Sequence, residues 1–102
     1  MTIIFVRKIE LQAGKDYEGL EMAKNLASHI KETQGLDVQL VRQLGGKPRM
    51  IAWTSRHENL ADFETTMEKM EADKVYQAMS HEAAGILKDG TIEDQLLKII
   101  DQ

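Results

Sequence analysis

The sequence predicts an α+β domain whose elements follow β-α-β-β-α-β order and form a four-stranded antiparallel sheet. Three patterns predict it. Residues 3–11 are rich in β-branched and aromatic side chains, which favour strands. Between Asp16 and Gly35, apolar side chains recur at three- and four-residue spacing, as in an amphipathic helix. Gly45 and Gly46 separate two short apolar runs, which is typical of a β-hairpin.

Capping and turn residues give the other boundaries. We expect Asp16 to cap the first helix and Gly35 to end it, because glycine enters the left-handed conformation without steric cost. We expect Asn59 and Asp73 to cap two later helices, which follow one another as far as Lys88. The other predicted strands are residues 38–44, 49–55 and 91–100.

This order is that of a ferredoxin-like unit, in which the helices cover one face of the sheet and leave the other open. Both alternating sets of the first strand are apolar, with Ile3 and Phe5 on one side and Ile4 and Val6 on the other. Covering an open face of roughly 400 Å² would contribute about 10 kcal/mol gross per subunit. We therefore expect a homodimer formed through the sheet faces.

Composition narrows the functional class. The 102 residues suit a single domain, spanning residues 1–102. A net charge of −4 with scattered basic residues argues against a nucleic-acid partner. With no cysteine and no long apolar run, we expect neither a thiolate metal site nor a membrane span, and we expect a cytoplasmic protein.

Three stretches, in this order, carry a family resemblance: Leu11-Gln12-Ala13-Gly14-Lys15; Ile51-Ala52-Trp53-Thr54-Ser55-Arg56 running into Asn59-Leu60-Ala61-Asp62-Phe63; and Ala72-Asp73-Lys74-Val75-Tyr76-Gln77-Ala78. Together they resemble the dimeric α+β barrel superfamily, which includes the antibiotic-biosynthesis monooxygenase-like and NIPSNAP-like domains. The resemblance implies two sheets facing each other in a dimer and a cavity between sheet and helices in each subunit. It does not imply one activity, since a fold hosts many functions.

The resemblance does not extend to haem degradation. The haem-degrading members carry an asparagine where this chain has Arg7, and our alignment puts Ser80 at the position of their haem-ligating histidine. His81 is one residue away, which turns its side chain by about 100° on a helix. We expect no cofactor and no metal.

The predicted substrate-binding residues lie on strands. Trp53 either stacks on a planar substrate or is an ordinary core aromatic. Arg7 shares an alternation set with Phe5, and a buried guanidinium needs an anionic partner. That partner is either a substrate carboxylate or a Glu or Asp of the partner subunit, and we favour the second. Gln39 and Gln43 complete the set.

His57 and His81 are the candidate catalytic bases, because imidazole titrates near neutrality; the alternative is that each is an ordinary exposed or hydrogen-bonded histidine. Two functional hypotheses follow. The first is a cofactor-free enzyme, monooxygenase-like or isomerase-like, acting on a hydrophobic or aromatic metabolite. The second is a non-catalytic NIPSNAP-like module that binds a small molecule or a protein. The sequence leaves open whether the protein is an enzyme.

Overall fold

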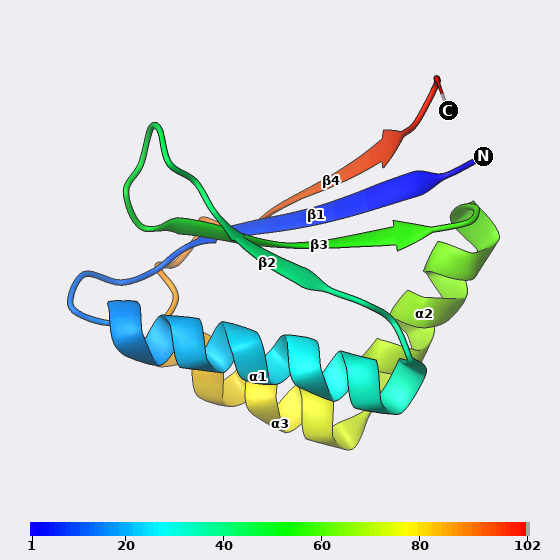
Figure 1. The fold of residues 1–102 in the computed structure, drawn as a ribbon. Coiled ribbons are helices and arrows are strands. Elements are labelled where there is room, and N and C mark those ends of the chain that lie inside the picture. The colour runs from blue at the N-terminus through cyan, green and yellow to red at the C-terminus, as the bar shows by residue number, and fades with distance from the viewer. Residues whose placement is uncertain (102) are drawn as a thin grey trace.

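The computed structural model, which describes residues 1–101, is a sheet with helices on one face (Figure 1). The strands lie in the order β2-β3-β1-β4, and all neighbours are antiparallel. This is the predicted four-stranded ferredoxin-like arrangement. Along the chain, the strands and α-helices follow in the order β1 (Ile3–Glu10), α1 (Asp16–Gln34), β2 (Gln39–Arg42), β3 (Met50–His57), α2 (Leu60–Ala72), α3 (Lys74–Glu82) and β4 (Glu93–Lys98).

Most predicted helix ends are confirmed. Gly35 ends α1 with a φ of 68°. The side chain of Asn59 accepts a hydrogen bond from the Asp62 amide at the start of α2, and Asp73 accepts from two amides at the start of α3. These side chains satisfy amides that have no partner within their helices.

Other boundaries were wrong. Asp16 is the first helical residue rather than the cap; Lys15 holds the cap position, and Asp16 pairs with Arg49 instead. α3 ends at Glu82 and is followed by a short 3₁₀ helix, Ala83–Gly85. The last strand begins two residues late because the Thr91 hydroxyl closes a turn, donating to the Lys88 carbonyl and accepting from the Glu10 amide.

The core lies between the sheet and α1. Its buried members are Ile9, Leu11, Ala23 and Ile51, the first two from β1 and the segment that follows it. A Cβ at Gly19 of α1 would lie 2.6 Å from a methyl carbon of Leu11, so this helical glycine allows α1 to approach that side chain closely. Apolar side chains of β1 and of the segment after it thus pack α1 against the sheet.

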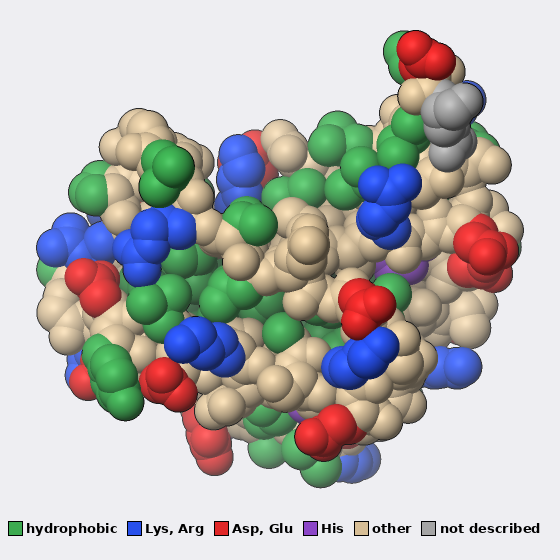
Figure 2. All heavy atoms as spheres, viewed as in Figure 1, with side chains coloured by type: hydrophobic (Ala, Val, Ile, Leu, Met, Phe, Trp, Pro, Cys, Tyr) green, Lys and Arg blue, Asp and Glu red, His purple; other side chains and the backbone are tan. Residues whose placement is uncertain are grey.

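The face of the sheet away from the helices is open, as expected from the order of elements. Strand register places Ile4 beside Leu97, and Lys8 beside Ala52. Paired residues share a face, so Ile4, Val6 and their neighbours point away from the helices. Val41 and Leu97 remain 44% and 47% exposed on this side. Figure 2 shows hydrophobic side chains reaching the surface above the sheet, among lysine and arginine side chains.

Replacing Ile9 with alanine should lower the free energy of unfolding by about 2–5 kcal/mol, because a fully buried side chain leaves a cavity. Urea denaturation measures this change. Leu44→Ala is the control: Leu44 is 95% exposed, and its loss should cost about 0.5 kcal/mol or less. Equal effects of the two substitutions would contradict the assigned core.

Candidate functional site

A cleft of about 470 Å³ opens between the helix-facing side of the sheet and α2. Phe5 of β1 and Phe63 of α2 form its aromatic wall, with ring centroids 5.1 Å apart and planes tilted by 46°. Among residues 1–101, the cleft is lined by Phe5, Arg7, Phe63, Met67, Glu71, Asp94, Gln95 and Leu96. An apolar wall with a few polar groups at one side is the usual character of a small-molecule site.

Arg7 lies beside this wall and is already paired. Its Nε and one terminal nitrogen each donate to an oxygen of Asp94 at 2.8 Å, a bidentate ion pair. The two residues stand directly opposite each other in the β1–β4 register. The hydrogen bonds to Asp94 raise the pKa of Arg7, against burial, which lowers it. The anionic partner that the sequence requires is therefore in the same chain, not in a partner subunit.

The guanidinium of Arg7 also lies over the Phe5 ring, 5.4 Å from its centroid. A cation at this distance interacts favourably with the negative face of the ring. Asp94 on one side and Phe5 on the other thus fix the orientation of Arg7 at the edge of the cleft.

Behind Phe63 lies a buried pair that the sequence analysis did not anticipate. The Ser55 hydroxyl and His57 Nε2 are 2.8 Å apart, and each residue is only 7% exposed. The His57 ring meets Phe63 edge-on, with centroids 5.2 Å apart. Burial lowers the pKa of His57, although the charge of Asp62 opposes the shift. His57 is accordingly a neutral imidazole near pH 7, one ring away from the cleft.

The two residues of this pair share the helix-facing side of β3 because they are two positions apart on a strand. The sequence pattern predicts that this strand ends at Ser55, two residues before its observed end at His57. Continuing the strand by two residues would have brought the two side chains together. Nothing local in the sequence points to Phe63 or Asp94, which reach the cleft from α2 and β4.

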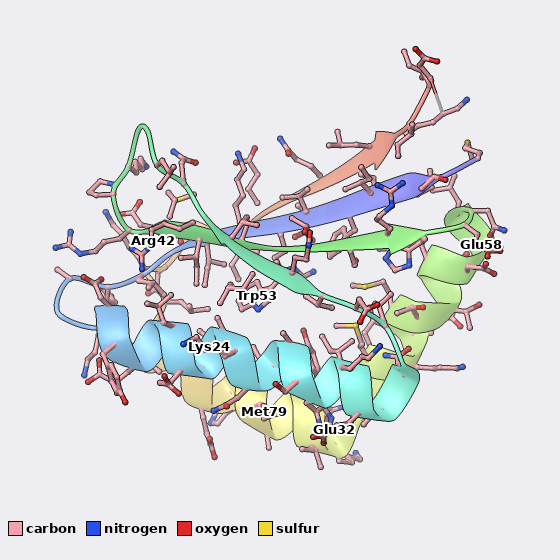
Figure 3. All side chains as sticks on the ribbon, viewed as in Figure 1. Lys24, Glu32, Arg42, Trp53, Glu58 and Met79 are labelled. Atoms are coloured by element: carbon pink, nitrogen blue, oxygen red, sulfur yellow. The ribbon has the colours of Figure 1, made fainter. Side chains whose placement is uncertain are left out.

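The other predicted residues are dispersed. Trp53 packs between the sheet and α1, where its Nε1 donates to the Ala23 carbonyl at 3.0 Å (Figure 3). It lines neither this cleft nor a larger, open groove of about 1090 Å³ beside the end of α1. Gln39 lines that groove, Gln43 is half-buried by the Gly46 turn, and His81 is exposed on α3. Their roles in binding or catalysis stay predictions.

A second histidine, His29, links the helices through a hydrogen bond to Asp73. His29 Nε2 on α1 lies 2.6 Å from Asp73 Oδ2, while the other oxygen of Asp73 accepts from the amides of Val75 and Tyr76. The hydrogen bond from His29 is the main reason that the pKa of Asp73 is lowered. One carboxylate therefore joins α1 to the junction of α2 and α3 and helps to hold α2 over the cleft.

Within residues 1–101, no three His, Cys, Asp or Glu side chains are grouped to hold a metal ion. Over the same residues, the helices are too short or too polar to span a membrane.

Comparison with known proteins gives the fold its context. No protein-family model and no curated protein matches the sequence. Solved structures do match over nearly the whole chain. An uncharacterised NIPSNAP domain protein from Burkholderia xenovorans superimposes with a TM-score of 0.80 at 19% identity, covering 95% of this chain and 93% of its own. The chain has the NIPSNAP-domain fold.

Two further structures show how widely this NIPSNAP-like fold is shared. A NIPSNAP family protein from Agrobacterium tumefaciens has a TM-score of 0.79 at 17% identity, covering 99% of this chain and 95% of its own. SnoaB, a cofactor-independent oxygenase from Streptomyces nogalater, has a TM-score of 0.72 at 13% identity, with the same coverage, 99% and 95%. The predicted resemblance is thus confirmed for the fold, and identities this low establish nothing about activity.

Acidification should destabilise the folded protein through His57. Because the folded pKa lies below the ordinary value of 6.5, the unfolded chain binds a proton more readily. Neutral His57 makes its full contribution to the free energy of unfolding above about pH 6.5, and this contribution is lost as the pH falls below that value. His57→Gln has no imidazole to protonate. Between about pH 7.5 and about pH 5, its free energy of unfolding, measured by urea denaturation, should therefore decrease less than that of the wild type. An equal decrease would exclude His57 as its source.

Proposed function

We propose that this chain is a dimeric α+β barrel protein that binds a hydrophobic, aromatic molecule in the cleft and oxidises it without a cofactor. The observation that carries the proposal is the Phe5–Phe63 wall with a buried, neutral histidine directly behind it. Aromatic side chains bind planar molecules through offset-stacked or edge-to-face contacts and by excluding water. The fold shared with a cofactor-independent oxygenase supports the same class of reaction.

His57 would act as the general base. A neutral imidazole can take a proton from a phenol or from an activated methylene carbon of the substrate. The resulting anion can give electrons to dioxygen. In the overall reaction, a C=O bond replaces both C–H bonds of the methylene; one oxygen atom enters the product, and the other leaves with both hydrogens as water. For this role Phe63 has to shift, because its ring separates His57 from the cleft.

That separation also supports the second hypothesis, a protein that binds such a molecule without transforming it. His57 is 7% exposed and its Nε2 is engaged with Ser55. If Phe63 stays in place, Ser55 and His57 are simply a satisfied polar pair in the interior, and the cleft remains a binding site.

Substituting His57 separates the two hypotheses. Uncharged bicyclic phenols should raise the melting temperature of wild type and His57→Gln alike, because Phe5 and Phe63 are unchanged. With a phenol whose keto form carries an activated methylene carbon, wild type should consume oxygen at an electrode, and His57→Gln should be slower by about 10²- to 10⁴-fold.

His81→Gln is the matched control, since His81 is exposed on α3 and should leave the rate unchanged. Binding without oxygen uptake across a panel of phenols would favour the non-catalytic function. Loss of activity in His81→Gln, with His57→Gln fully active, would reverse the assignment of the base.

The homodimer rests on the open face of the sheet. Ile4, Val6 and Leu97 point away from the helices, and apolar side chains gathered on an open sheet face are usually covered by a partner. A second copy presenting the same face satisfies both chains at once, as two-fold interfaces do.

Val6→Asp should therefore dissociate the dimer, because each interface would bury two unpaired carboxylates related by symmetry. Sedimentation velocity at micromolar concentration should give twice the 11.6 kDa chain mass for wild type and the single-chain mass for the variant. Val75→Asp adds the same charge on α3, where the side chain is 55% exposed, and should stay dimeric. A monomeric wild type would contradict the proposed assembly.

A further inference from the structure

We infer that the cleft accepts uncharged aromatic molecules and excludes anionic ones, and that Asp94 is the residue that sets this preference. The inference rests on the proposed function of the cleft and adds the charge class of its ligand. It starts from the three charged side chains in the lining, which are Arg7, Glu71 and Asp94.

Arg7, the one cation among the described lining residues, already has an anionic partner. Arg7 donates two hydrogen bonds to the Asp94 carboxylate, one from Nε and one from a terminal nitrogen, each at 2.8 Å, and strand pairing holds the two residues opposite each other. A ligand carboxylate would have to compete for the guanidinium of Arg7 with the Asp94 carboxylate, which the strand pairing keeps beside it. Because an intramolecular partner acts at a high effective concentration, the free ligand is at a disadvantage.

Glu71 adds a second obstacle for an anion. This residue of α2 lines the cleft, and no basic side chain within residues 1–101 forms an ion pair with its carboxylate. With one cation against two carboxylates, the lining carries one net negative charge. An anion entering the cleft would meet the repulsion of this net negative charge without gaining an unpaired cation.

An uncharged aromatic molecule meets none of these costs. Its ring can lie against Phe5, Phe63 and Met67, and a hydroxyl hydrogen can be donated to the free carboxylate of Glu71. The charge pattern of the cleft therefore selects a neutral, planar ligand with a hydrogen-bond donor.

The test uses 2-naphthol and 2-naphthoate, which share a ring system and differ in charge. Isothermal titration calorimetry near neutral pH should show naphthol binding to wild type, with naphthoate at least about tenfold weaker. Asp94→Asn keeps the shape of the side chain but releases Arg7. It should tighten naphthoate binding by about tenfold or more while changing naphthol binding little.

Glu71→Gln is the matched control: it removes the same charge as Asp94→Asn but leaves Arg7 paired. Its gain in naphthoate affinity should be clearly smaller than that of Asp94→Asn. In the double variant Arg7→Gln/Asp94→Asn the gain should vanish, because the anion has lost its cation. Circular dichroism checks that each variant is folded.

The possible outcomes test the charge preference separately from the proposed binding function of the cleft. Equal affinities of wild type for the two compounds, or no gain in Asp94→Asn, would overturn the charge preference and leave the aromatic site intact. Failure of both compounds to bind wild type and Asp94→Asn would overturn the cleft as a binding site, and the inference with it. Should Asp94→Asn not fold, the comparison of wild type with Glu71→Gln still decides: a large gain in Glu71→Gln would mean that net charge, not Asp94, sets the preference.

Discussion

The two-residue alternation of β1 is the constraint on which the rest of the molecule depends. Helices cover only one face of the sheet, so each side chain of this central strand either enters the layer beneath the helices or faces outward (Figure 1). Ile9 goes into the core, Phe5 and Arg7 border the cleft, and Ile4 and Val6 face outward. A shift of register by one residue would exchange all three groups at once.

The cleft exists because the helix layer is uneven. α1 lies tightly on the sheet through Ala23 and Gly19, both buried against β1 and the segment after it. α2 has a single buried residue, Met70, and the Phe63 ring of this helix contacts Phe5 and His57 of the sheet. A loosely packed helix leaves space beneath it and can move with little loss of buried surface. The proposed shift of Phe63 therefore involves a helix with little buried surface to lose.

Much of the fold could be predicted because its signals are local. Helix periodicity, the caps at Asn59 and Asp73, and the glycine at position 35 each depend on a few neighbouring residues. Asp16 is the first helical residue instead of the cap, and its carboxylate pairs with Arg49, a partner far along the chain that local preference does not indicate. The length of β3 was missed for a similar reason, since His57 pairs with Ile3 across the sheet.

The site was harder to predict because its contacts join distant segments. Arg7 and Phe5 were correctly expected to share a face, but the partner of Arg7 depends on the register between the first and last strands. Trp53 drew attention as the single tryptophan, yet its indole is satisfied by a carbonyl of α1. Residue type alone does not separate a tryptophan that fills a core from one that holds a ligand.

The most direct test of the account uses the fact that the chain contains two phenylalanines, which are the two rings of the aromatic wall. Protein labelled with fluorophenylalanine should give two fluorine resonances, and saturating 2-naphthol should shift both of them. If the melting temperature rises with naphthol while both resonances stay in place, the ligand binds elsewhere and the cleft is not the functional site.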